Sequence, residues 1–350
     1  SGMSVAEFVL FKKTKRGLFF FILLIAQVFA TQCLNTKCAA GDLACDPTLI
    51  ALAYLYPPAG AQFVAAGASG SVYTSSDGYN WSANTGPGGP LLTGVVLHDG
   101  LYLAQGASSN FISSDGQNWI SSTVSGSSSL SNSTYFHGLF ITANFGGGPT
   151  LFYSSDGQNW NSGPSLAGMA DFEGSREYKD RLYIVDSGGN IASSTDGVNW
   201  TTPVGFGGSD SDSLATDGQA LLISDDTDVY RSTDGQNFQS VHSFSTFSLS
   251  IVYGNGKFVV FGDNGGSVDV FESFDGVNWS KTANLGAISI VESTFGNGVF
   301  VALSSGGDIC TSADAYSWDC RAYTPAPKKI TFGYRETGLQ EDIDGALDAL

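Results

Sequence analysis

The stretch Ser113-Ser114-Asp115-Gly116-Gln117-Asn118-Trp119 decides the fold, because close variants of it occur seven times in the chain. Successive copies are 38 to 41 residues apart, measured between their aspartates, and all six tryptophans occupy the last position of a copy. The seven aspartates are Asp77, Asp115, Asp156, Asp196, Asp234, Asp275 and Asp314. A fixed period of this length is typical of an array of similar supersecondary units.

Each copy has the chemistry of a tight turn between two β-strands. Asp-Gly between two β-like segments is one of the strongest short-range hairpin signals, because Gly adopts positive φ at little steric cost. The Asp carboxylate can accept hydrogen bonds from N–H groups of the turn, and the Ser two residues earlier can add another. We therefore expect the seven aspartates to cap their own turns rather than to bind metal. The aromatic residue four positions after each Asp should pack between neighbouring units.

The sequence between two turns predicts four short strands in each period. Within residues 248–281, the predicted strands are 248–253, 257–262 and 267–273, with a fourth strand beginning at 277. Four antiparallel strands in about 40 residues describe one propeller blade. The sequence therefore predicts an all-β protein, a seven-bladed β-propeller of four-stranded antiparallel blades.

The first period lacks a first strand, so its innermost strand must come from elsewhere in the chain. Residues 329–333, Lys-Ile-Thr-Phe-Gly, follow the seventh turn and resemble a first strand. We expect this C-terminal segment to complete the first blade and to leave no open sheet edge. Residues 48–57 are the alternative donor.

The cysteines predict two disulfides if one of the five carries a lipid; the five are Cys33, Cys38, Cys45, Cys310 and Cys320. Cys310 and Cys320 flank the seventh turn, in which Ala315 and Ser317 replace the usual Gly and Asn. A disulfide between them would compensate for a more strained turn. Cys38 and Cys45 would then form the other pair, leaving Cys33 for lipidation. Zinc is a poorer explanation, because none of the three histidines lies at ligand spacing from a Cys.

The first 32 residues have the pattern of an export signal. Basic residues precede an apolar run from Leu18 to Ala30, which is short for a ~30 Å bilayer core. Cleavage after Ala30, lipidation of Cys33 as in a bacterial lipoprotein, and an uncleaved anchor are the competing interpretations. We expect a signal peptide or anchor at 1–32, a tether at 33–58, the propeller at 59–335 and an acidic tail at 336–350. The protein is then exported to the bacterial cell envelope, in the periplasm or on the outer-membrane surface, or is secreted, and lipid on Cys33 would attach it to a membrane.

The composition limits the classes of partner. The chain has 33 Asp and Glu against 15 Lys and Arg, for a net charge of −18, and 45 of its 350 residues are Gly. The charge argues against a nucleic-acid partner, because phosphate neutralisation requires a basic surface. Aromatic residues make up 13% of the chain, which argues against disorder. We expect a monomer.

The Ser-x-Asp-Gly-x-x-Trp turns resemble the Asp-box, or BNR, repeats of sialidase-like propellers, over about residues 60–333. The Asp-box of that family normally has one residue between Asp and Gly, whereas here the two are adjacent, as in exported bacterial BNR-like propellers of unknown role. The resemblance implies a propeller and suggests sialidase chemistry, which uses three arginines, a Tyr nucleophile with a Glu partner and an Asp acid/base. After the signal only five arginines remain, and no Arg-Ile-Pro-type segment exists. We therefore assign no catalytic residue.

The channel of the propeller is the expected place for a ligand. Aligned on their turns, the predicted first strands form one small or polar row, which contains Gly94, Asn132, Gly174, Asp212, Ser250 and Glu292. The candidate ligand-binding residues are Asp212, Glu292, Glu173, Arg176 and Asn132. The alternative is that they are hydrated channel walls. The acidic loops 209–212 and 224–228 lack the full spacing of a calcium loop, so we expect no cofactor, with calcium as the alternative.

These observations favour a non-catalytic binding scaffold for a protein or a glycan. The resemblance to sialidases supplies one alternative, a carbohydrate-active hydrolase that works at the channel mouth. A periplasmic assembly factor, similar to the propellers that help to build photosynthetic complexes, is another alternative.

Overall fold

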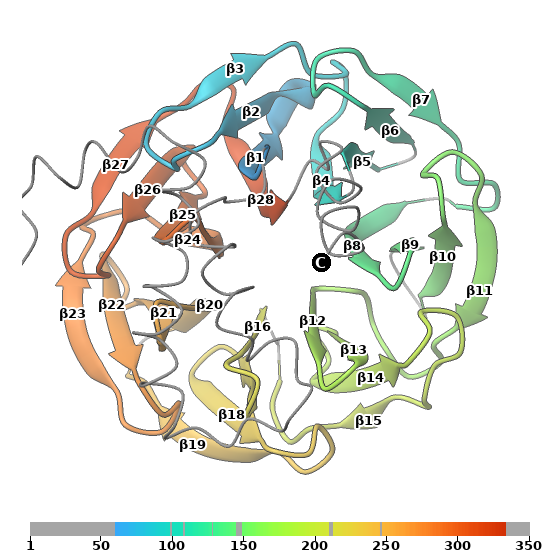
Figure 1. Ribbon diagram of the computed structural model, residues 1–350. Coiled ribbons are helices and arrows are strands. Elements are labelled where there is room, and N and C mark those ends of the chain that lie inside the picture. The colour runs from blue at the N-terminus through green and yellow to red at the C-terminus, as the bar shows by residue number, and fades with distance from the viewer. Residues whose placement is uncertain are drawn as a thin grey trace, which may run out of the picture. The chain divides into compact units, whose positions relative to one another are not determined.

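The computed structural model describes residues 60–98, 100–107, 109–127, 129–144, 149–209, 213–245 and 247–333. In these residues, seven four-stranded antiparallel sheets stand as blades around a central channel (Figure 1). The predicted all-β, seven-bladed propeller is confirmed. From the channel outward, the strands are β28 (Pro327–Gly333), β1 (Gln62–Gly67), β2 (Val72–Ser75) and β3 (Ser82–Asn84) in blade 1; β4 (Leu92–His98), β5 (Leu101–Gly106), β6 (Asn110–Ser113) and β7 (Ile120–Ser122) in blade 2; β8 (Leu130–Phe136), β9 (Leu139–Asn144), β10 (Thr150–Ser154) and β11 (Asn161–Ser165) in blade 3; β12 (Gly174–Tyr178), β13 (Arg181–Val185), β14 (Asn190–Ser194) and β15 (Val204–Gly205) in blade 4; β16 (Ser213–Thr216), β17 (Leu221–Ser224), β18 (Asp228–Ser232) and β19 (Gln239–Ser243) in blade 5; β20 (Phe247–Gly254), β21 (Lys257–Asp263), β22 (Val268–Ser273) and β23 (Ser280–Asn284) in blade 6; and β24 (Ile290–Gly296), β25 (Val299–Ser304), β26 (Asp308–Ser312) and β27 (Asp319–Ala322) in blade 7.

The C-terminal strand closes the ring, as expected. β28 pairs antiparallel with β1, with Phe332 opposite Phe63 and Thr331 opposite Val64. In Figure 1 the red β28 lies beside the blue β1. β28 therefore occupies the innermost position of blade 1. The alternative donor, residues 48–57, lies outside the described part of the chain.

Each Asp turn is held by its own side chains. In blade 1, Asp77 Oδ1 accepts the N–H groups of Tyr79 (2.9 Å) and Asn80 (2.8 Å), and Oδ2 accepts Asn80 Nδ2 (2.7 Å). The Ser75 hydroxyl donates to Asp77 Oδ1 (3.0 Å) and accepts the N–H of Gly78 (2.9 Å). These hydrogen bonds, led by the Asn80 N–H, lower the pKa of Asp77 to about 2.

The other six turns repeat this arrangement. The backbone and Ser hydrogen bonds recur in every copy, and they lower the pKa of all six remaining aspartates: Asp115, Asp156, Asp196, Asp234, Asp275 and Asp314. The predicted capping role of the seven aspartates is confirmed. The fourth strand starts later than predicted: β23 begins at Ser280, because the N–H groups of Val277 and Asn278 bond to Asp275 and cannot join the sheet ladder.

The last residue of each turn packs between blades, as predicted. Trp81 of blade 1, for example, joins an apolar cluster that contains Phe63 of its own blade and Val301 of blade 7. Each copy contributes its aromatic residue to the cluster that its blade shares with the preceding blade; the seven residues are Trp81, Trp119, Trp160, Trp200, Phe238, Trp279 and Trp318. The apolar core is therefore divided into layers between the blades.

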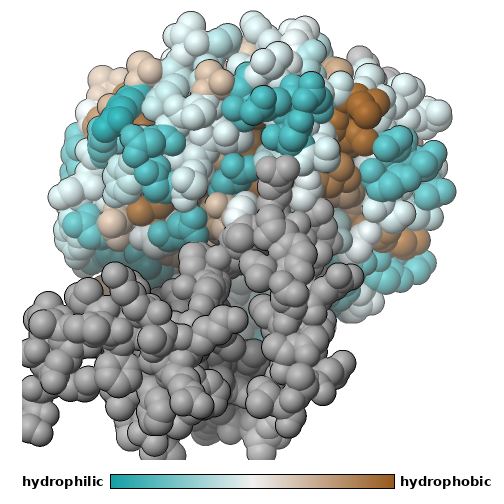
Figure 2. All heavy atoms as spheres, turned by 45° about the horizontal axis from the view of Figure 1, so that its top comes forward, coloured by the Kyte–Doolittle hydropathy of each residue, from teal (hydrophilic) through white to brown (hydrophobic). Residues whose placement is uncertain are grey.

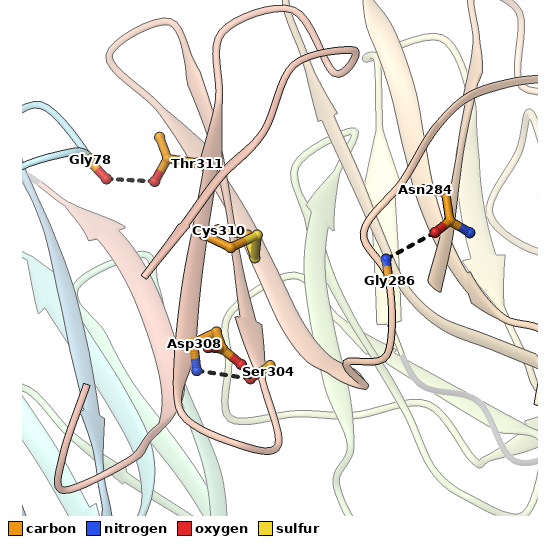
Figure 3. Close-up of a disulfide and its surroundings, with 8 residues drawn as sticks. Gly78, Asn284, Gly286, Ser304, Asp308, Cys310 and Thr311 are labelled. Atoms are coloured by element: carbon orange, nitrogen blue, oxygen red, sulfur yellow. Dashed lines mark hydrogen bonds between the residues drawn. A yellow bond between two sulfur atoms is a disulfide. The ribbon is translucent and has the colours of Figure 1, made fainter. Parts of the chain in front are cut away.

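A disulfide joins the two outer strands of blade 7. Cys310 in β26 lies opposite Cys320 in β27, and their sulfur atoms are bonded (Figure 3). It flanks the turn in which Ala315, instead of Gly, adopts a φ of 65°. Next to Cys310, the Thr311 hydroxyl donates to the Gly78 carbonyl of blade 1 (2.6 Å), which ties the last blade to the first (Figure 3). The predicted pair Cys310–Cys320 is confirmed, while Cys33, Cys38 and Cys45 lie outside the described residues.

Candidate functional site

The innermost strands of all seven blades line one channel with a cavity volume of about 410 Å³. Because successive strands run in opposite directions, the turn after each inner strand and the Asp turn lie at the same end of a blade. We call this the turn end. The loops between second and third strands and the connections between blades lie at the other end, the loop end.

Four of the five candidate residues line this channel. Asn132 lies on β8, Arg176 on β12 and Glu292 on β24, and Glu173 immediately precedes β12. The fifth candidate, Asp212, lies outside the described residues. The candidates that the repeat predicted therefore come from three different blades and line the same cavity.

The predicted row holds only in part. Gly174, Ser250 and Glu292 each lie four residues before the end of their inner strands and line the channel. Asn132 also lines the channel, but it does so as the extra residue of a β-bulge, with φ of 45°, between two ladder pairs. Gly94 packs against the next blade, because a Cβ at this position would lie 2.6 Å from the Ser133 hydroxyl.

Three of the candidates form hydrogen bonds to the backbone of the next blade. Asn132 Nδ2 donates to the carbonyl of Glu173. Arg176 Nε donates to the carbonyl of Leu214 (3.1 Å), and Glu292 Oε2 accepts the N–H of Ile330 (3.2 Å). These side chains therefore connect adjacent inner strands, and the connections exist without a ligand.

Other inner-strand side chains, which the sequence analysis did not single out, serve the same purpose. The Ser213 hydroxyl accepts the N–H of Ile251 (2.7 Å), and the hydroxyls of Ser250 and Ser293 bond to each other (2.5 Å). A further residue missed by the sequence analysis is Lys329 of β28, whose ammonium lies 3.9 Å from Glu292 Oε2. Lys329 could have been found, because it begins the segment that was predicted to close the ring.

The charged groups of the channel influence one another. The channel walls raise the pKa of Glu292, Lys329 opposes this rise, and the charge of Glu173 adds to it. The Glu292 side chain nevertheless keeps 26% of its surface exposed, because the channel is wide enough to admit solvent. The walls also lower the pKa of Arg176 by desolvation.

Aromatic rings line the turn end of the channel. His98 stacks on Tyr135 with ring centroids 3.5 Å apart. Phe332 covers Gly296, where a Cβ would lie 2.2 Å from the ring, so only Gly fits beneath it. The channel is thus apolar at the turn end and charged toward the loop end.

The structure gives the predicted calcium alternative no support in the described residues. Asp225, in one of the two acidic loops, accepts the N–H groups of Thr227 (3.0 Å) and Asp228 (2.7 Å) from its own loop. Across the described ranges, no three His, Cys, Asp or Glu side chains gather as a metal site would require.

A second candidate surface lies at the turn end of blades 6 and 7. Phe274 and Tyr316 are 70% and 51% exposed, and Val277 beside them is also exposed. We call these three residues the aromatic patch. The ammonium of the buried Lys257 lies 6.0 Å from the Phe274 ring centre and 5.0 Å from that of Tyr316, so both rings converge on one point.

The base of the aromatic patch is a network of hydrogen bonds. Lys257 Nζ donates to Glu272 Oε2 (2.8 Å) and to the Asp314 carbonyl (2.6 Å), and the Tyr316 hydroxyl donates to Glu272 Oε1. The hydrogen bond and charge of Glu272 raise the pKa of Tyr316. On the face in Figure 2, hydrophilic residues and residues of intermediate hydropathy predominate, and hydrophobic residues form smaller groups.

No protein-family model matches the chain, and no curated protein matches it. Among solved structures, the chain is similar to a protein from Lactobacillus plantarum at 10% identity, with a TM-score of 0.58 over 78% of this chain and 99% of that one. It is similar to streptogramin B lyase at 9% identity, with a TM-score of 0.54 over 79% of this chain and 91% of that one. It is also similar to YCF48 bound to D1 peptide at 14% identity, with a TM-score of 0.52 over 71% of this chain and 94% of that one.

These similarities show the propeller fold alone, because all the identities are low and the proteins named differ in function. Within the described residues, no helix has the length and apolar character needed to cross a membrane.

Proposed function

We propose that the protein is a non-catalytic binding scaffold that recognises a partner protein through the aromatic patch. The exposure of Phe274 is the observation that carries the proposal. Phe274 occupies the second motif position, where the other six copies have Ser, Thr or Ala. A 70% exposed Phe stabilises the turn no better than those small residues would, so its large apolar surface points to an intermolecular contact.

The charge around the patch favours a basic segment of the partner. Asp275 and Asp314 lie in the same two turns, and their lowered pKa values keep them ionised. A cationic side chain laid on an aromatic ring between carboxylates gains both ion-pair and cation–π energy. The net charge of −18 acts in the same direction.

The repeat itself supplies the variants for a test. Phe274→Thr and Tyr316→Gln each introduce the residue type used by other copies, so the turns should still fold. Partners are captured from an envelope extract by cross-linking, and their affinity is then measured with purified proteins and with a glycan array. The double variant should reduce the affinity for the partner protein at least tenfold, whereas Val198→Gln, at the Tyr316 position of blade 4, should not. Equal binding by wild type and double variant would refute the proposal. Binding to a glycan but to no protein would also refute it and would identify a glycan as the ligand.

We also propose that the propeller works outside the cytoplasm, attached through a lipid on Cys33 or released after cleavage. The disulfide Cys310–Cys320 supports an oxidising compartment, and the basic and apolar N-terminal segments support export. Mass spectrometry of the native protein gives the mature N-terminus and any lipid mass on Cys33. A native protein that retains residues 1–32 in the cytoplasmic fraction contradicts export.

A carbohydrate-active hydrolase is the second candidate, in keeping with the resemblance to sialidase-like propellers. One observation favours it: Glu173 and Glu292 line the same cavity, and desolvation together with the charge of Glu173 raises the pKa of Glu292, as expected for a general acid. Chromogenic glycosides and sialosides test it directly. Turnover that is lost in both Glu292→Gln and Glu173→Gln would establish this candidate, and absence of turnover with all of them would remove it.

A further inference from the structure

Arg176 lines the channel without a carboxylate partner among the described residues. Its Nε donates to the Leu214 carbonyl, but the described ion pairs of the chain involve other cations. The second channel cation, Lys329, faces Glu292 at 3.9 Å. The planar guanidinium is therefore held in place by one of its N–H groups, while its two terminal amino groups have no acidic partner in the described structure.

Three threonines lie at the level of Arg176 and offer hydroxyl donors, whereas the corresponding residues of the other three inner strands, Val96, Leu214 and Val252, are apolar. Thr134, Thr294 and Thr331 lie on β8, β24 and β28, each two residues before the end of its inner strand, as Arg176 is on β12. All four residues line the cavity. The acidic residue Glu292 lies two residues further toward the loop end, which corresponds to about 7 Å along a strand.

We propose that the channel binds a small oxyanion, a carboxylate or a phosphate group, between the Arg176 guanidinium and the hydroxyls of Thr134, Thr294 and Thr331. A guanidinium offers two parallel N–H donors that match a carboxylate or phosphate, and threonine hydroxyls complete such a shell. Arg176 is exposed within the channel, so its guanidinium is accessible to a ligand.

The acids at the loop-end level restrict the ligand. Glu173 and Glu292 repel a highly charged anion, which favours a compact group or a ligand whose other end is cationic. The cavity volume of about 410 Å³ leaves room for a molecule of metabolite size around the anionic group. This site does not depend on the aromatic patch, so either one can fail without the other.

The test uses the whole chain and two probes, sodium acetate and sodium phosphate, at constant ionic strength set with sodium chloride. Thermal unfolding and calorimetry should show saturable binding of at least one probe, and the probe that binds identifies the anion class. Arg176→Gln should weaken this binding at least tenfold, and Arg176→Lys should weaken it less. Arg231→Gln, which removes an arginine of β18 that is not part of the channel lining, is the matched control and should bind as wild type does.

The second set of variants keeps the proposal testable if Arg176→Gln does not fold. Thr294→Val and Thr331→Val retain the shape of the side chain and remove the hydroxyl, and each should weaken binding about threefold to tenfold. Saturable binding of neither probe by the wild-type chain overturns the proposal. Binding that is unchanged in the Arg176 variant, or unchanged in both Thr variants, overturns it as well.

Discussion

At the scale of single residues, each Asp turn depends on one carboxylate that serves several donors. Asp77 accepts hydrogen bonds from the Ser75 hydroxyl, from two backbone N–H groups and from the Asn80 amide. Turn geometry and the ionised state of the Asp are therefore coupled.

This coupling predicts a loss of stability in acid. The pKa of Asp77 is about 2 in the folded protein, against about 3.9 for an unfolded chain. Since the folded pKa is the lower one, the stabilisation is complete above about pH 4 and declines as the pH falls toward 2. Urea unfolding of the wild type and of Asp77→Asn, measured at pH 5, 4, 3 and 2, should show a shallower pH dependence for the variant. Parallel curves would contradict the prediction.

The glycine that follows the Asp is required by both φ and space. Gly78 has a φ of 77°, and a Cβ there would lie 2.9 Å from Val299 Cγ2. Gly78→Ala should lower the free energy of unfolding by about 1–3 kcal/mol, because backbone strain and a clash with the neighbouring blade add. Gly256→Ala is the control: its φ is 75°, but nothing lies within 4 Å of the added atom. Denaturant titration should show a smaller loss for the control, and equal losses would exclude a packing contribution.

At the scale of elements, blade 7 differs from the others by its disulfide. The bond joins β26 and β27 across the turn that contains Ala315, with a sequence separation of 10 residues. The bond restricts the conformations that the unfolded chain can adopt between the two cysteines. Removing it therefore raises the entropy of the unfolded state and lowers the stability of the folded one.

The Cys310→Ala/Cys320→Ser double variant should lose about 2–3 kcal/mol of unfolding free energy. Chemical reduction of the wild type should give a similar loss, since both treatments remove the same link. Urea titrations with and without a thiol reductant measure both effects. A double variant as stable as the oxidised wild type would show that the hairpin does not need the bond.

The elements also show which information the sequence contains. Turn, strand and aromatic positions follow from local signals that recur seven times, so the blades and the Asp caps could be predicted. The bulge at Asn132 could not, because it depends on how β8 meets β9 and on the Glu173 carbonyl of the next blade. The same limit applies to Arg176: the residue could be placed in the channel, but its hydrogen bond to the Leu214 carbonyl of the next blade is a property of the assembled ring.

At the scale of the whole molecule, stability depends on closure by β28. Ile330 of β28 is buried in the cluster that blade 1 shares with blade 7, together with Phe63 and Val301. The ring therefore has one joint at which the first and last segments of the propeller meet.

Ile330→Ala should lower the free energy of unfolding by about 2–4 kcal/mol, as expected for a buried large-to-small change. Ile120→Ala is the control, because Ile120 is 63% exposed on the outermost strand of blade 2 and should cost little. Denaturant unfolding followed by tryptophan fluorescence measures both variants. If Ile330→Ala is as mild as the control, the joint is not a point of weakness.

The position of β28 also sets an order of events during biosynthesis. A ribosome completes β1 long before it reaches Pro327–Gly333. The inner edge of β1 therefore stays unpaired with β28 while the other six blades are synthesised. Only a chain that includes Pro327–Gly333 can pair β28 with β1, and a chain that terminates before this segment exposes an edge that can recruit strands from other molecules. Closure thereby distinguishes finished chains from unfinished ones.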